Sequence, residues 1–195
     1  MRYAETQLAR SASARALDLG CGAGRNAVPL ARMGWHIVGT DVSWPMLHAA
    51  SARDGGGRLH LALAPMHAVP MRSRSVDLIV AHGIWNLARS AVEFRQAVAE
   101  AARVAKPGAA LFVFTFSRHT LLPSAQPVAG ETFVFTQFSG APQCFLTELQ
   151  LIAELRDAGF APDPDQPLRE HNRPPTGSLL AGGSPVIYEG GFRFI

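Results

Sequence analysis

The sequence is poor in cysteine, in lysine and in long apolar runs, and each shortage excludes a class of protein. With Cys21 and Cys144 alone there is neither a disulfide framework nor a CxxC motif, and the seven histidines lack the spacing of a helical zinc pair. We therefore predict no metal site. The longest apolar run, Ala109–Phe114, is far shorter than the roughly 20 residues that span a bilayer, so we expect no membrane partner.

Charge is also sparse. Charged residues make up 17% of the chain, Lys106 is the single lysine and the arginines are scattered, so that the net charge is +3 despite a pI of about 9.4. No block of like charges forms the basic patch that nucleic acids bind, so we do not expect a nucleic acid partner. The N-terminal segment lacks the apolar middle of a signal peptide, so we expect a cytoplasmic protein.

What the sequence does have is a regular alternation. Hydrophobic residues make up 48% of the chain, and apolar runs of strand length alternate with helix-length segments, which predicts an α/β fold with a parallel sheet. We expect a single domain over residues 1–195. Strands are predicted at 16–19, 36–40, 59–63, 76–81 and 110–116, with a closing hairpin near 185–188, and helices at 24–33, 43–53, 91–104 and 147–158.

Two stretches interrupt this alternation. Residues 118–145 hold three prolines around a β-like run at 131–138, and we expect them to form an insertion or a lid after the fifth strand. Gly55-Gly56-Gly57 predicts a turn.

The informative stretch is ALDLGCGAGRNAVPLARMGWHIVGTD, residues 16–41. A predicted strand is followed by glycines at alternate positions, Gly20, Gly22 and Gly24, where missing side chains let the backbone approach a ligand. Such a ligand should lie at the carboxyl ends of the parallel strands. Asp41 ends the second predicted strand, and its carboxylate can accept hydrogen bonds from both hydroxyls of a ribose.

The order of these residues selects the cofactor. The dinucleotide fingerprint is GxGxxG, which lays a pyrophosphate on a helix N-terminus, whereas this loop is GxGxG and follows an acid, Asp18. A carboxylate there would repel a pyrophosphate but suits a ligand that carries an ammonium and a sulfonium. The pattern therefore favours S-adenosylmethionine (SAM) over NAD.

With these residues the chain resembles the class I SAM-dependent methyltransferases. The matching segments follow in the family's order along residues 16–160: the glycine loop, Asp41-Val42-Ser43 with Met46-Leu47 and Ala50, Val76–Val80, Arg103–Gly108 and Phe145–Phe160. The GCGAGRN form of the loop is similar to that of the tellurite-resistance and thiopurine group. The resemblance implies a Rossmann-like, doubly wound, mostly parallel seven-stranded sheet with a C-terminal antiparallel hairpin.

The resemblance also implies which residues bind SAM. Those implied for its methionine part are Asp18, Gly20, Cys21, Gly22, Ala81 and His82. Those implied for its ribose and adenine are Asp41, Val42, Pro65 and Met66. Pro65 stands where the family often has an acid for the adenine amino group, and losing that hydrogen bond would cost about 1.5–3 kcal/mol if nothing replaces it.

Several of these residues have a structural alternative. Asp18 could be a buried carboxylate held by backbone donors, and Asp41 a charge that favours a helix N-terminus. Cys21 is expected to be a small loop residue rather than a nucleophile. Trp85 and Asn86 follow the fourth strand and are candidates for substrate contact, although packing explains Trp85 equally well.

The sequence says less about the methyl acceptor and the catalytic residues than about the cofactor. In-line transfer to a soft or readily deprotonated acceptor needs no strong base, and His82 and His119 are the candidates if one exists. Few residues precede the first strand, so the acceptor site is either open or closed by 118–145 or by a partner subunit, as in a homodimer. The leading hypothesis is a SAM-dependent methyltransferase with a small-molecule acceptor; the alternatives are a SAM-binding regulatory protein without transfer activity and an RNA methyltransferase.

Overall fold

The structure is a computed structural model that describes residues 1–11, 13–53, 57–173 and 184–195. Its large sheet is built from β1 (Arg15–Leu19), β2 (His36–Asp41), β3 (Leu59–Leu63), β4 (Val76–His82), β5 (Ala105–Phe116), β8 (Phe160–Pro162), β9 (Arg169–His171) and β10 (Ile187–Phe194). The strand order is β3-β2-β1-β4-β5-β10-β8, with β9 paired to β10. Strands β1 to β5 run parallel and β10 is antiparallel to its neighbours, which confirms the predicted fold class; β9 adds a strand to the expected seven.

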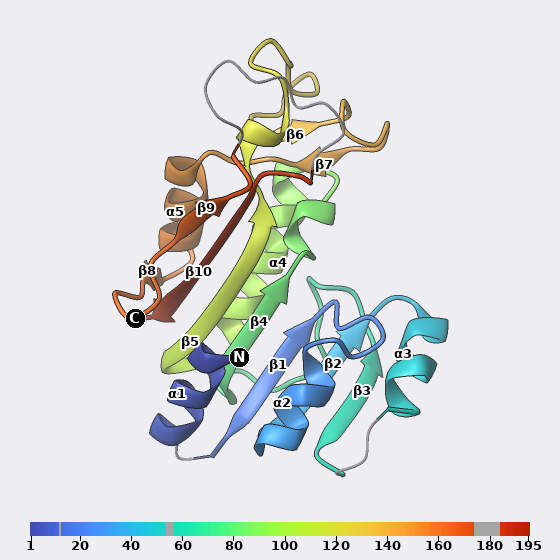
Figure 1. Cartoon of the computed structure of the whole chain (residues 1–195), viewed down its shortest axis with the longest axis vertical. Helices are drawn as coiled ribbons and strands as arrows, with labels where there is room; N and C mark the ends of the chain where they lie inside the picture. Colours follow the sequence, from blue (N-terminus) through green and yellow to red (C-terminus); the bar gives the residue numbers. More distant parts are fainter. Residues whose placement is uncertain (12, 54–56, 174–183) are drawn as a thin grey trace.

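Helices cover both faces of this sheet (Figure 1). They are α1 (Arg2–Arg10), α2 (Ala27–Met33), α3 (Trp44–Ser51), α4 (Ala91–Val104) and α5 (Glu148–Asp157). Because side chains alternate along a strand, β1 and β4 feed two separate cores. Leu17 and Ile79 pack with α4 and α5, whereas Ala16 and Leu78 pack with α1 and α2.

Local sequence signals begin and end these helices. The Ser90 hydroxyl caps α4 by accepting a hydrogen bond from the Glu93 amide, and Thr147 with Gln150 forms a reciprocal capping box at the start of α5. Gly34 ends α2 in the left-handed conformation that glycine adopts most easily. These ends lie where the sequence predicts them.

The predicted insertion, residues 118–145, contains the turn η2 (Arg118–Thr120) and the short strands β6 (Val134–Phe135) and β7 (Gln143–Cys144). It lies beyond the carboxyl ends of β4 and β5 (Figure 1). Its buried Leu121, Phe135 and Phe145 pack against Phe116, the last residue of β5. The β-like run expected at 131–138 pairs only at Val134–Phe135.

The remaining differences from the sequence predictions are local. Helix α1 was not predicted, and the helix expected from Gly24 begins at Ala27, because residues 22–26 form turns. The turn predicted at Gly55-Gly56 lies outside the described residues. In the described part of the chain, no helix has both the length and the apolar character needed to cross a membrane.

Candidate functional site

The glycine loop joins β1 to α2 and has two distinct glycines. Gly20 has φ +64°, and a Cβ there would lie 2.6 Å from Cδ1 of Ile84, so this glycine lets the loop after β4 pack closely. Gly22 has φ +52°, yet the nearest atom to a Cβ there would be Cε of Met46 at 3.6 Å. Gly22 therefore exposes its backbone to the side on which a ligand would lie.

Asp41 ties this loop to the start of α3. Its Oδ2 accepts a hydrogen bond from the Gly22 amide at 2.9 Å, and its Oδ1 accepts one from the Ser43 amide at 2.8 Å. Each carboxylate oxygen has a second lone pair, so a ribose can still be bound. Asp41 thus fixes the conformation of the glycine loop, a role that could not be predicted from the sequence. Its binding of a ribose remains a prediction.

Cys21 points away from the ligand side of the loop. A Cβ on Gly39 would lie 2.8 Å from Sγ of Cys21, so the thiol fills the space that Gly39 leaves on β2. Burial raises the pKa of the Cys21 thiol to about 12. The side chain is therefore a packing residue and not a nucleophile, and only its backbone can contact a ligand.

Asp18 is a buried acid beneath the loop. Its side chain is 1% exposed, and neither oxygen has a hydrogen-bond partner of good geometry among the described residues. Burial raises its pKa to about 7, although the Ala27 amide and the Arg25 charge act in the opposite direction. A buried carboxylate without a donor is costly, and a bound ammonium group would satisfy it. The site therefore fits the cationic end of SAM.

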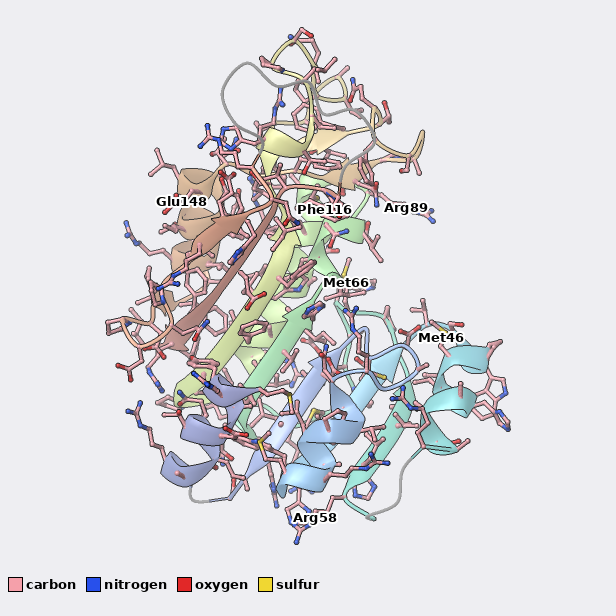
Figure 2. All side chains as sticks on the ribbon, in the orientation of Figure 1. Met46, Arg58, Met66, Arg89, Phe116 and Glu148 are labelled. Atoms are coloured by element: carbon pink, nitrogen blue, oxygen red, sulfur yellow. The ribbon has the colours of Figure 1, made fainter. Side chains whose placement is uncertain are left out.

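The expected adenine side is apolar and open. Val42, just after β2, is 71% exposed, and Leu63, the last residue of β3, is 60% exposed. Met46 belongs to the first turn of α3 and is also exposed (Figure 2). Met66, by contrast, is buried and packs in the core with α4. Pro65 is half-buried. Met46 is thus better placed than Met66 to contact an adenine next to Val42.

The end of β4 faces both the loop and β5. Nδ1 of His82 lies 2.7 Å from a guanidinium nitrogen of Arg25, and the His82 ring stacks on Phe114 with centroids 4.2 Å apart. Burial, and then the Arg25 charge, lower the pKa of His82, so the ring is neutral at pH 7. Because Arg25 can only donate, Nδ1 accepts and Nε2 carries the proton. This geometry makes His82 a hydrogen-bond donor rather than a base.

Next to His82, β5 presents a row of half-buried phenylalanines. Phe112, Phe114 and Phe116 occupy alternate positions on the face that α1 and α2 cover only in part. Figure 2 shows Phe116 near the carboxyl end of β5. We call Phe112, Phe114, Phe116 and His82 the aromatic stripe.

Three other candidates after or within β4 are buried. Trp85 is fully buried against Phe94, so the packing explanation applies and the indole does not face a substrate. Asn86 is 3% exposed, and its Oδ1 has no partner in the described part of the chain. Its contact with an acceptor remains a prediction. Ala81 is fully buried.

His119, the other base candidate, has an acidic partner that the sequence did not indicate. Its Nδ1 lies 2.6 Å from Oε1 of Glu170, and Ser117 donates to the same oxygen. Burial opposes the charge of Glu170, but the hydrogen bonds from Ser117 and His119 outweigh it and lower the pKa of Glu170. The carboxylate therefore accepts, and Nδ1 carries the proton. Nε2 faces a guanidinium nitrogen of Arg173 at 3.4 Å, and its role as a base remains a prediction.

Comparison with known proteins places this site in a family. A family model described as a methyltransferase domain matches residues 17–113, which contain the glycine loop, Asp41 and most of β5. Residues 17–113 therefore form a methyltransferase domain of the SAM-dependent kind. It resembles a demethylmenaquinone methyltransferase of Corynebacterium urealyticum, with 35% identity over 104 residues that cover 53% of this chain and 42% of the relative. It also resembles a ubiquinone/menaquinone biosynthesis C-methyltransferase of Syntrophotalea carbinolica, with 34% identity over 58% of this chain and 48% of the relative.

The chain spans a little under half the length of these curated relatives. Structural similarity covers more of the chain than these sequence matches do. The structure of Burkholderia thailandensis 1,6-didemethyltoxoflavin-N1-methyltransferase, with its substrate and S-adenosylhomocysteine bound, superimposes with a TM-score of 0.71 at 20% identity. That match covers 99% of this chain and 77% of the other, so the strands and helices outside residues 17–113 also follow the methyltransferase fold.

Proposed function

We propose that this chain transfers a methyl group from SAM to a small, planar, apolar acceptor of the quinol class. The observation that carries the proposal is the aromatic stripe, because half-buried rings in a row bind a flat aromatic molecule by stacking. The names of the relatives, demethylmenaquinone and ubiquinone/menaquinone methyltransferases, agree with an acceptor of this kind.

The chain's own residues would bind and orient the reactants. Asp18 would accept the ammonium of SAM, Gly22 would let it approach, and Asp41 would hold its ribose, while Val42 and Met46 flank the adenine. When bound, SAM supplies a methyl group activated by a sulfonium. The stripe would hold the acceptor carbon in line with that methyl group, so that the bond to sulfur breaks as the bond to carbon forms, and the proton displaced from the ring carbon would pass to solvent. Residues 118–145 would cover the acceptor.

The test is methyl transfer to reduced 1,4-naphthoquinone (1,4-naphthalenediol) under anaerobic conditions, with deuterated-methyl SAM. We expect S-adenosylhomocysteine to form and the deuterated methyl to appear on a ring carbon. Phe114→Leu should raise the KM for the diol about 10-fold, since it removes the ring that contacts His82. Leu149→Ala, an exposed apolar residue on the other face of the sheet, is the matched control.

Other outcomes identify the alternatives. The glycine loop also resembles that of the tellurite-resistance and thiopurine group, and methylation of 6-mercaptopurine but not of the diol would replace the quinol class with a soft thiol acceptor. SAM binding without transfer to either probe would favour a regulatory SAM-binding protein. Transfer to RNA, with affinity that falls steeply with salt, would favour the RNA methyltransferase.

A further inference from the structure

The connection between β3 and β4 leaves one face of the sheet partly open. Residues 64–75 form turns and irregular chain without a helix, whereas a parallel sheet is ordinarily covered on both faces. Ile37 and Leu59 pack with α2 on one face, so Val38 lies on the opposite face. On that face a cavity of about 660 Å³ is lined by residues near the amino ends of β1, β2 and β3 and by the connection.

Cationic and imidazole side chains from separate parts of the sequence meet at this cavity. Arg15 pairs in register with His36 across β1 and β2, and His60 of β3 lines the same cavity. Arg72 lines it from the connection. Arg58 extends this set, because its Nη1 lies 2.9 Å from Nε2 of His36. The fold therefore gathers arginines that are scattered along the sequence.

This positive charge is not balanced by acids at the cavity. None of the described residues that line it, apart from its masked surroundings, is acidic, and no ion pair of the described residues includes Arg15 or Arg72. Asp77 accepts a hydrogen bond from the Arg15 amide at 3.0 Å, but its carboxylate also forms an ion pair with Lys106 at 2.7 Å. The guanidinium groups of Arg15 and Arg72 are thus available to an anion.

The chemistry of the lining selects the kind of anion. A guanidinium presents its donors in a planar fork that matches two oxygens of a phosphate. Val38, Pro70 and Met71 add an apolar part to the lining, which can pack against an organic group. Small-molecule sites have volumes of about 300–1,000 Å³, so this cavity suits a single nucleotide rather than a nucleic acid strand.

The cavity is separate from the glycine loop. His36 begins β2 and Asp41 ends it, and five steps of about 3.3 Å place the two residues about 17 Å apart. A ligand at the amino ends of the strands therefore leaves the SAM site free.

We propose that Arg15, His36, His60 and Arg72 form a second binding site, which takes an organic phosphate of nucleotide size. We call it the phosphate cavity. It goes beyond the proposed function, and its test measures binding without turnover, so either can fail while the other stands.

The test is calorimetry of the intact chain with uridine triphosphate and with inorganic triphosphate, in the presence of excess S-adenosylhomocysteine to occupy the SAM site. We expect both to bind, and the nucleotide to bind more tightly because Val38 and Met71 can pack against its nucleoside. Arg15→Gln and Arg72→Gln should each weaken both ligands about 10-fold, since each removes charge-assisted hydrogen bonds. Both side chains are exposed, so neither substitution disturbs the core.

Arg89→Gln is the matched control, because it makes the same change in charge at an exposed residue. Figure 2 shows Arg89 and Arg58 at opposite ends of the sheet. An equal loss of affinity in this control, or no binding of either probe, would overturn the phosphate cavity. Binding that S-adenosylhomocysteine abolishes would place the phosphates in the SAM site, which also contradicts the proposal. Equal affinities for the two probes would mean an adventitious ion only, and tighter binding of an RNA oligonucleotide than of uridine triphosphate would replace the cavity with a nucleic acid surface.

Discussion

Replacing Asp18 by asparagine should make the ligand-free protein more stable and weaken its binding of SAM. Asp18 is buried and lacks a hydrogen-bond partner of good geometry within the described residues, so its negative charge is unfavourable until a cation arrives. Asparagine has nearly the same shape and no charge. The substitution therefore removes the unfavourable charge from the folded state and removes the attraction for an ammonium group at the same time.

The size of the gain follows from the pKa. Burial raises the pKa of Asp18 from 3.8 to about 7, which corresponds to about 4 kcal/mol between the ionised and neutral folded states. Below the ordinary pKa the carboxyl is neutral in both folded and unfolded chains, so no penalty exists. Between the two pKa values the folded chain keeps a proton that the unfolded chain has lost, and stability falls as the pH rises. The difference between Asp18→Asn and the unmodified protein should grow from about 2 kcal/mol at pH 5 to about 4 kcal/mol at pH 8.

Urea unfolding of the ligand-free protein at these two pH values measures this difference. Asp157→Asn, at the exposed end of α5, is the control and should show no such growth with pH. Saturating SAM should raise the Tm of the unmodified protein and have a much smaller effect on Asp18→Asn. The argument fails if the substitution destabilises the protein at pH 8, or if it stabilises the protein while SAM binds as before.

Other substitutions test the remaining parts of the site. Gly20→Ala should lower stability by about 1–3 kcal/mol, because its Cβ would meet a packed side chain at positive φ, and thermal unfolding will show this. Gly22→Ala should change stability less but weaken SAM at least about 10-fold in calorimetry, and normal binding would mean that no ligand approaches here. Cys21 and Cys144, whose pKa values burial raises to about 12, should resist iodoacetamide at pH 8 until urea unfolds the protein; rapid labelling of the folded protein would contradict their burial. Glu170→Gln should destabilise the protein by about 1–3 kcal/mol at pH 7. Since the pKa of Glu170 is lowered, that difference should shrink as the pH falls below the ordinary glutamate value, and a constant difference would exclude the ionised hydrogen-bonded pair.

The parts of the molecule that the sequence predicted are those whose signals are local. The strands β1 to β5 lie where apolar runs of strand length occur, and the helices α4 and α5 begin at residues whose side chains cap them. The spacing of Gly20 and Gly22 predicted a loop with its backbone open to a ligand, and both glycines have positive φ. These features require only neighbouring residues, so one stretch of sequence is enough to reveal them.

The parts that the sequence did not predict depend on contacts between distant residues. Helix α1 is mainly polar, and it is held by a hydrogen bond from Tyr3 to the buried Asp163, 2.9 Å long. Glu170 reaches His119 only because β9, a strand of three residues, pairs with β10. Neither contact produces a periodic pattern in the sequence, because each joins residues that are far apart along the chain.

The direction in which a side chain points was the other feature that could not be predicted from the sequence, and this direction decides the chemistry of the site. His82 is the last residue of β4 and Trp85 follows it closely, yet His82 turns towards the glycine loop and Trp85 turns into the core. Arg25 stands in the quoted loop motif, but its importance arises only from the side chain that it contacts across the sheet. The position of a residue after a predicted strand shows that it lies near the carboxyl edge of the sheet. Packing on the two faces of the sheet then determines whether its side chain contacts a ligand or a neighbouring side chain. The contact between Arg25 and His82, and the stacking of His82 on Phe114, follow from the arrangement of the loop, β4 and β5 and not from any one of them alone.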